Sequence, residues 1–284
     1  GLYIVTSTAF TFYDVAYSSM AAEMTADYRA RTLLVGYKMM AARAGIVLAV
    51  IAAPWFFTSG DTLADGFASM GIAAGAVMIL SGLWAFFATA QAPQITRPIQ
   101  HFSLKVEYQA LKENRPFLIL WLVFLCQNIA VGATATLQIY LVIFVMKVDQ
   151  ALVGTMVAIS AISAMLATPL WVRLARRHGK RRIYFISMGM AVVLAIPVLF
   201  LPAGWPVALF TLFLLAGIAD AATQLCPNAM VPDTVEYDEA RSGERREGAI
   251  FGTWLLARKL GMALGAFAIS LVLTLFGFQA GVDP

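Results

Sequence analysis

Long apolar stretches alternate with short polar connections along the chain. A helix needs about 20 residues to cross the roughly 30 Å hydrocarbon core of a bilayer. Eight stretches approach or exceed this length: 1–22, 44–58, 67–90, 117–146, 151–172, 183–201, 207–231 and 249–278. The second stretch is short, and the segment Gly36–Arg43 extends it as an amphipathic turn. The sequence shows no run with strand-like alternation, so the pattern predicts an all-α, multi-pass membrane helix bundle.

The composition agrees with insertion into a membrane. Of the 284 residues, 61% are hydrophobic and 13% are charged, whereas soluble domains average about 45–50% and about 25%. The mean hydropathy is +0.78. A soluble fold with so few charges would expose large apolar patches, and disorder requires low hydrophobicity. Both of these classes are therefore excluded.

Lysine and arginine concentrate in every second connection. Seventeen of the 20 basic residues lie in the segments 23–43, 91–116, 173–182 and 232–248, while the loops between these segments hold Lys147 alone. Basic loops remain in the cytoplasm, so these four segments are predicted to be cytoplasmic. We expect an integral protein of the bacterial cytoplasmic membrane. Positive charge spread over four short loops does not indicate nucleic-acid binding.

The longest basic connection divides the apolar stretches into three and five. We predict an N-terminal helical group over 1–90, a central cytoplasmic loop over 91–116 and a C-terminal group over 117–284. This topology places both ends of the chain outside the cell, and the chain has no initiating Met. Transporters built from two halves commonly have six helices in each half. We therefore expect a fragment that lacks three spans in front and one behind.

Four charged residues lie inside the apolar stretches: Asp14, Asp220, Arg258 and Lys259. Such charges are costly and usually face a bundle interior or a wet cavity. Asp220 is expected to form an ion pair with Arg258 or Lys259. These two basic residues are adjacent and point about 100° apart on a helix, so only one is expected to face the cavity. Asp14 is either a packing residue or a carboxylate that binds Na⁺ or a proton.

The stretch 117–146 is unusually polar for a membrane span. Its amide and hydroxyl side chains are Gln127, Asn128, Thr134, Thr136, Gln138 and Tyr140. They could hydrogen-bond a polyol such as a sugar or hold helices together, and the sequence leaves both possibilities open. Three Gly-xxx-Gly pairs predict close helix packing: Gly71 and Gly75, Gly248 and Gly252, and Gly261 and Gly265.

Two segments carry more specific motifs. The first is FYDVAYSSMAAEMTADYRART at 12–32, followed by GYKMMAARAG, and the second is VPDTVEYDEARSGERREGAIFGTWLLARKLG at 231–261. Together they resemble the glycoside-pentoside-hexuronide:cation symporters, the melibiose permease family of the major facilitator superfamily. The motifs cover about sixty residues. The resemblance implies a major facilitator fold in which the eight stretches are helices four to eleven of twelve.

The resemblance also implies roles for single residues. Asp14 stands where the family has the helix-four acid that binds the coupling cation, which makes it a Na⁺ ligand if the protein uses sodium. Lys38 matches the basic residue of the sugar site, and Lys259 matches the lysine of the family's charge network. Ala16 and Ser18 replace a proline and an aromatic residue of the melibiose permeases, which argues against melibiose as the solute.

The sequence thus predicts a secondary active transporter that couples a sugar-like solute to Na⁺ or H⁺ by alternating access. We expect a monomer in the lipid bilayer that uses no cofactor besides the coupling ion. The predicted roles are cation binding by Asp14, solute binding by Lys38, Asn128 and Tyr140, and a charge network of Asp220, Arg258 and Lys259. The alternatives are transport of another solute such as a lysolipid, and a fragment inactive on its own. No His-rich cluster or Gly-x-Ser-x-Gly motif indicates an enzyme.

Overall fold

The computed structural model describes residues 2–24, 28–58, 62–90, 112–141, 150–200, 205–243 and 246–277. All regular structure in these ranges is helical, which confirms the predicted fold class. The elements are α1 (Leu2–Glu23), α2 (Tyr28–Thr58), α3 (Leu63–Thr89), α5 (Arg115–Tyr140), α6 (Gln150–His178), α7 (Lys180–Ala195), the 3-10 helix η2 (Pro197–Phe200), α8 (Pro206–Ser242) and α9 (Glu247–Leu275).

Several helices continue beyond the predicted apolar stretches. Helix α2 begins at Tyr28, and α8 continues through the segment 232–242, which the sequence pattern assigns to a loop. Helices α6 and α7 are likewise separated only by Gly179, whose φ of 90° reverses the chain. Hydropathy detects the part of a helix that lies in hydrocarbon, whereas polar residues outside the bilayer can continue the same helix. The predicted loop boundaries at 173–182 and 232–248 are therefore wrong.

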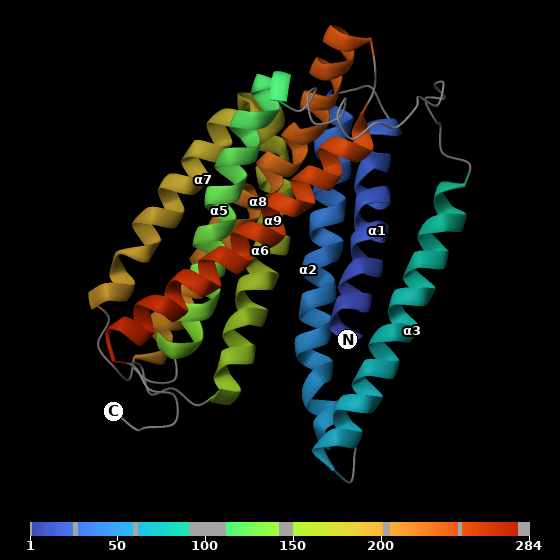
Figure 1. Cartoon of the computed structure of the whole chain (residues 1–284). Helices are drawn as coiled ribbons and strands as arrows, with labels where there is room; N and C mark the ends of the chain where they lie inside the picture. The colour runs from blue at the N-terminus through green and yellow to red at the C-terminus, as the bar shows by residue number, and fades with distance from the viewer. Residues whose placement is uncertain are drawn as a thin grey trace.

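Six of the described helices are long and apolar enough to cross a bilayer: α2, α3, α5, α6, α8 and α9. Helix α7 has only 16 residues and, like α1, runs alongside these longer helices (Figure 1). The chain is therefore an integral, multi-pass membrane protein. Large apolar side chains cover the outer surface of the bundle, as in Trp84, Phe87 and Val192, where a membrane protein meets lipid.

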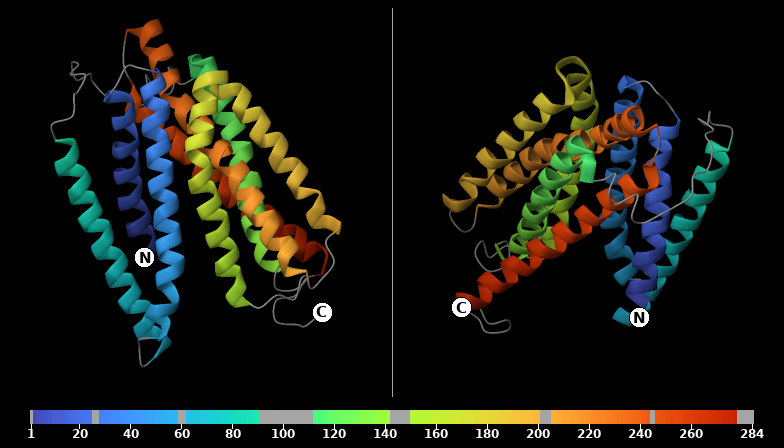
Figure 2. Two further views of the ribbon diagram at one scale, coloured as in Figure 1. Left: turned by 180° about the vertical axis from the view of Figure 1, so that it is seen from behind. Right: turned by 45° about the horizontal axis from the view of Figure 1, so that its top comes forward.

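The helices form two groups, α1 to α3 and α5 to α9 (Figures 1 and 2). In the second group α5 packs along α9, while α6 and α7 pack on α8. Helix α2 contacts α6 and α8 across the groups, and α1 contacts α9. Most of the predicted central loop lies outside the described residues, so the predicted domain boundaries stay a prediction.

Two buried clusters hold the second group together and reach into the first. One cluster lies between α6, α7 and α8 and includes Val35 of α2. The other joins α5, α8 and α9, with Val15 of α1 packed against it. In this second cluster the rings of Phe124 and Trp254 stack with centroids 3.8 Å apart. The apolar core therefore continues across the boundary between the two groups.

The three Gly-xxx-Gly pairs differ in what they contact. A methyl group at Gly261 would lie 2.7 Å from Cβ of Asn128, and one at Gly265 would lie 2.6 Å from the backbone nitrogen of Ala133. This pair lets α9 approach α5 closely. The other four glycines, Gly71, Gly75, Gly248 and Gly252, have no described atom within 4 Å of such a methyl group. Close packing was therefore wrongly predicted for these two pairs, within the described residues.

The basic helix ends gather at one end of the bundle, at the top in Figure 1. We call this the basic end; there α1, α3, α6 and α8 end and α2, α5, α7 and α9 begin. Ion pairs tie its helices to α8. Lys180 of α7 binds Asp233 at 2.8 Å, and Arg246, at the start of α9, lies 3.5 Å from Asp238. The strict alternation of basic loops agrees with this arrangement.

Candidate functional site between the two helix groups

Four polar side chains form a stripe along α1. Ser7, Thr11, Asp14 and Ser18 follow one another at intervals of four, three and four residues. Residues at this spacing share one face of a helix. The Thr11 hydroxyl donates to the Ser7 carbonyl at 2.6 Å, and the Ser18 hydroxyl lies 3.3 Å from Asp14 Oδ1. Within a membrane-spanning bundle, this stripe presents polar groups to the facing helices.

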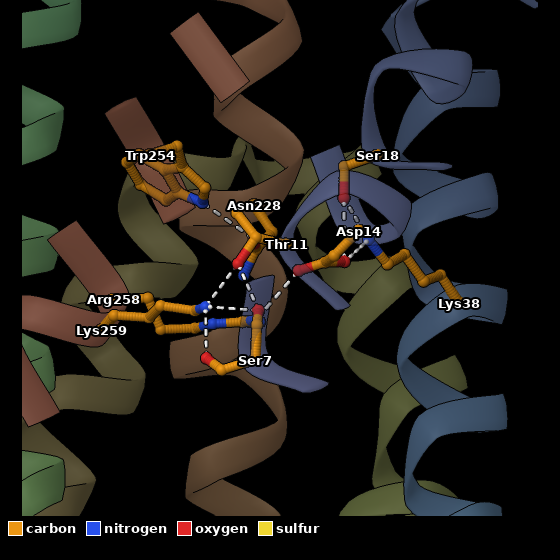
Figure 3. Close-up of polar contacts among 9 residues, drawn as sticks. All are labelled: Ser7, Thr11, Asp14, Ser18, Lys38, Asn228, Trp254, Arg258 and Lys259. Atoms are coloured by element: carbon orange, nitrogen blue, oxygen red, sulfur yellow. Dashed lines mark hydrogen bonds and ion pairs between the residues drawn. The ribbon is translucent and has the colours of Figure 1, made fainter. Parts of the chain in front are cut away.

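Asp14 lies at the centre of this stripe and forms ion pairs with two basic side chains from other helices (Figure 3). Arg258 Nη2 of α9 donates to Asp14 Oδ2 at 2.9 Å. Lys38 Nζ of α2 lies 3.5 Å from Asp14 Oδ1. The Asp14 side chain is 14% exposed. All three residues lie about 15 Å from the basic ends of their helices, so the carboxylate joins three helices near the middle of the membrane.

Lys38 is held by groups on one helix. Its ammonium group donates to the Ser18 hydroxyl at 2.6 Å and lies 5.3 Å from the centre of the Tyr17 ring. Tyr17 in turn stacks on Tyr13 at 5.7 Å between ring centres. A cation over an aromatic face is attracted by the ring quadrupole. The α1 surface therefore offers Lys38 a carboxylate, a hydroxyl and an aromatic ring.

Lys259 also reaches the α1 stripe. Its ammonium group lies 2.6 Å from Thr11 Oγ1, 3.2 Å from Ser7 Oγ and 3.3 Å from the Ser7 carbonyl (Figure 3). Arg258 and Lys259 therefore both contact α1, whereas the sequence predicted that only one of them would face the cavity. Both side chains are long, so two residues that start about 100° apart on α9 still reach adjacent turns of α1.

Asp220 has a different partner from the expected one. Its carboxylate pairs with the guanidinium of Arg43, which joins α8 to α2. The predicted pairing of Asp220 with Arg258 or Lys259 is wrong, because α1 lies against α9 and its stripe binds both of these basic side chains. Two ion pairs, Arg43–Asp220 and Arg258–Asp14, thus bridge the two helix groups.

The residues predicted on α5 lie away from the Asp14 cluster. Asn128 is 2% exposed, donates to the Phe124 carbonyl of its own helix at 2.8 Å and packs against Gly261. Tyr140 is the last residue of α5, about 18 Å further along the helix axis. The described contacts of Asn128 are with α5 and α9, and none of them involves Asp14 or Lys38. Their roles in solute binding stay a prediction.

The cluster of Asp14, Lys38, Arg258 and Lys259 is rich in positive charge. Lys38 and Arg258 contact the Asp14 carboxylate, whereas Lys259 contacts hydroxyl and carbonyl oxygens on the neighbouring turn of α1. Within the described residues, no group of three or more His, Cys, Asp or Glu side chains could hold a metal ion. The arrangement suits reversible exchange of ion pairs between helices.

Sequence reasoning missed four residues of this region. Ser7, Thr11 and Ser18 hold the two lysines, and their signal was available in the four-three-four spacing around Asp14. Arg43 was counted with the basic segment 23–43, and the predicted helical extension over Gly36–Arg43 placed it near the start of the helix. In the structure α2 begins at Tyr28, so Arg43 lies four turns inside the helix.

Comparison with known proteins identifies the family. The family model described as "MFS/sugar transport protein" matches residues 1–284. The chain belongs to this family. Relatives whose names include glucuronide carrier protein homolog and symporter agree with the resemblance to the glycoside-pentoside-hexuronide:cation symporters and with a major facilitator fold. The family is one of transporters, in agreement with the expectation that the chain is not an enzyme.

Three relatives illustrate the similarity. An uncharacterized symporter of Synechocystis sp. is 32% identical over 169 residues, which cover 60% of this chain and 31% of the relative. A glucuronide carrier protein homolog of Escherichia coli is 27% identical over 286 residues, covering 98% and 61%. The uncharacterized symporter YnaJ of Bacillus subtilis is 24% identical over 283 residues, covering 98% and 61%. The chain spans at most about three fifths of the length of these relatives.

Proposed function

We propose that the protein carrying this chain is a secondary active transporter that couples a sugar-like solute to Na⁺ or H⁺. The observation that carries this proposal is Asp14, a carboxylate near the middle of the membrane that bridges the two helix groups. Intramembrane carboxylates with exchangeable partners are typical of ion pathways. Relatives named as symporters and as a glucuronide carrier support coupled transport of a sugar-like solute.

The ion pairs suggest how binding is linked to movement. Arg258 and Lys38 reach Asp14 from two different helices, and one of these helices belongs to the opposite group. A coupling cation that binds Asp14 must compete with both side chains. Neutralising Asp14 in this way weakens an ion pair that bridges the two helix groups. Alternating access requires such bridges to break so that the groups can move relative to each other. Asp14 thereby couples cation binding to the relative position of the halves, and that coupling is reciprocal between cation and solute.

Solute binding is proposed for Lys38, together with Asn128 and Tyr140. Lys38 contacts Asp14 directly, so a solute that binds this ammonium group changes the surroundings of the carboxylate. The charge network is proposed to comprise Asp220 with Arg43, and Arg258 and Lys259 with the α1 stripe. We further propose a monomer in a bacterial cytoplasmic membrane, with the basic end in the cytoplasm.

Uptake into proteoliposomes of the complete protein tests this function. We expect solute accumulation driven by an inward Na⁺ or H⁺ gradient, and Asp14→Asn is expected to lower gradient-driven uptake at least about tenfold, or about 1.4 kcal/mol. The matched control is Glu113→Gln, which removes a carboxylate from an exposed pair with Arg241 and is expected to leave uptake within about twofold. Unchanged gradient dependence in Asp14→Asn would refute the cation-site assignment. A lysophospholipid in the same assay tests the alternative solute class.

A further inference from the structure

The turn that joins α6 to α7 concentrates positive charge that no acidic residue of these two helices balances. The sequence has no Asp or Glu between Asp149 and Asp220. The segment 232–248, in contrast, has six acidic residues beside its three arginines. The charge at the α6–α7 turn must therefore be balanced by groups outside these helices. Its basic residues are Arg173, Arg176, Arg177, Lys180, Arg181 and Arg182.

Among the described residues, only one of these six basic side chains has an acidic partner. Lys180 is buried and pairs with Asp233 of α8. The five arginines are exposed, and none of them forms an ion pair with a described acidic side chain. Arg181 instead lies over the Phe185 ring, 5.8 Å from its centre. The turn therefore presents several guanidinium groups to its surroundings at the basic end.

The exposed face of α6 changes from apolar to basic along one stripe. Its exposed residues follow one another at intervals of four, four, three and four, so they share one face of the helix. They are Ile162, Leu166, Leu170, Arg173 and Arg177. Arg173 lies about 16 Å from Ile162 along the helix axis, which is close to half of the roughly 30 Å hydrocarbon core. The apolar part of the stripe therefore has the length of one leaflet's hydrocarbon.

Helix α7 repeats this arrangement in the opposite direction. Arg182, Phe185 and Val192 are exposed at intervals of three and seven residues, so they also share one face. Gly179 reverses the chain between α6 and α7, which meet at the basic end (Figure 2). The basic ends of both stripes therefore lie at one turn, and each stripe continues from there toward the middle of the membrane as apolar side chains.

We propose that the α6–α7 turn binds an anionic phospholipid of the leaflet at the basic end. The lipid phosphate lies among the exposed arginines, and the acyl chains lie along Leu166, Leu170 and Phe185. Guanidinium groups match the geometry of phosphate, and clustered basic residues at a membrane surface attract anionic lipids. An acidic protein would contact the arginines, but it would not reach the apolar side chains within the hydrocarbon. The continuous stripes therefore favour a lipid.

Native mass spectrometry of the complete, delipidated protein in detergent tests this site. The probes are phosphatidylglycerol, which is anionic, and phosphatidylcholine, which is zwitterionic, both with one palmitoyl and one oleoyl chain. The wild-type protein is expected to bind phosphatidylglycerol at least about fivefold more tightly. A third probe, sn-glycerol 3-phosphate, carries a phosphate without acyl chains. It is expected not to displace phosphatidylglycerol when present at the same concentration.

Matched double variants test whether the arginines of the turn carry this preference. Arg177→Gln combined with Arg181→Gln is expected to reduce the preference for phosphatidylglycerol to about twofold or less. The control combines Arg115→Gln with Arg241→Gln, which removes the same charge from exposed positions at the basic end. Its preference is expected to stay within about twofold of wild type. Ratios between the two lipids cancel a loss of folded protein.

Three results would overturn the proposal. The first is equal affinity of the wild-type protein for the two lipids. The second is an equal fall of the preference in both double variants, because the attraction would then come from the overall charge of the basic end. The third is displacement by sn-glycerol 3-phosphate, which would assign the arginines to a soluble phosphate compound. Lipid binding is measured without solute or cation gradient, so none of these results bears on the proposed symport.

Discussion

The ammonium group of Lys180 lies 2.8 Å from a carboxylate oxygen of Asp233 and 2.7 Å from the carbonyl oxygen of Ala229. Lys180 is 2% exposed, although it is the first residue of α7 and two arginines follow it. A buried ammonium group must be neutralised and hydrogen-bonded. The pair therefore fixes the start of α7 against α8 at the basic end.

Breaking this pair is expected to destabilise the protein. Asp233→Asn leaves a buried charge without its carboxylate, which typically costs about 3–5 kcal/mol. Lys180→Met leaves the partly exposed Asp233 instead and is expected to cost less. The double variant is expected to lose less free energy of unfolding than the sum of the losses in the two single variants, as measured by unfolding in detergent. Arg182→Met, at an exposed position on the same turn, serves as the control with a change within about 0.5 kcal/mol.

The close approach of α5 and α9 predicts different effects for two glycine pairs. Gly265→Ala places a methyl group against backbone atoms of Ile129 and Ala133, which cannot rotate away as a side chain could. The two helices must therefore separate, and we expect the free energy of unfolding to fall by about 1–3 kcal/mol. The methyl group of Gly252→Ala, in the neighbouring Gly-xxx-Gly pair, meets no described atom within 4 Å. This substitution is expected to raise the free energy of unfolding by about 0.5–1 kcal/mol. Equal destabilisation by both substitutions would contradict this difference.

Hydropathy predicted an apolar stretch in each of the eight described α-helices, although only six of them are long and apolar enough to cross a bilayer. It did not predict where α2 begins or where α8 ends, since Tyr28 and Ser242 lie in polar sequence that the helices continue through. The Gly-xxx-Gly pairs likewise show where close packing is allowed. Only the positions of neighbouring helices decide that Gly261 and Gly265 use this possibility and Gly248 and Gly252 do not.

The sequence identified most charged residues of the candidate site, but it did not predict which acidic residue pairs with which basic residue. Asp14, Arg258 and Lys259 stood out as charges inside apolar sequence, and the resemblance pointed to Lys38. Which acid binds which base depends on how α9 lies against α1, and no periodic pattern encodes that packing. As a result, Asp220 was paired with the wrong helix, and Arg43 was not recognised as its partner.

The ion pair between Arg43 and Asp220 bridges the helix groups and predicts compensating substitutions. Arg43→Gln and Asp220→Asn each leave a charge inside the bundle without its partner, so both are expected to lower gradient-driven uptake several-fold. The double variant removes both charges and is expected to recover part of this loss. Initial rates in proteoliposomes measure the effect. A double variant that is as impaired as the product of the two single effects would show that the residues act independently.

Gln127, which the sequence left between solute binding and helix packing, lies in a buried network. Its amide oxygen accepts a hydrogen bond from the Tyr184 hydroxyl at 2.8 Å, and its amide nitrogen donates to the Thr223 carbonyl at 3.1 Å. The network joins α5, α7 and α8, and both side chains are buried. We therefore expect Gln127 to stabilise the C-terminal helices without contacting the solute.

Tyr184→Phe is expected to leave the amide oxygen of Gln127 buried without its donor, at a cost of about 1–3 kcal/mol. The same substitution in a Gln127→Met background removes no such bond, so it is expected to cost much less, and the difference measures the coupling between the two residues. Unfolding in detergent gives these values. Because the network is structural, the solute dissociation constant of folded Tyr184→Phe protein is expected to stay within about twofold of wild type. A larger change in affinity with little change in stability would instead place Gln127 in the solute site.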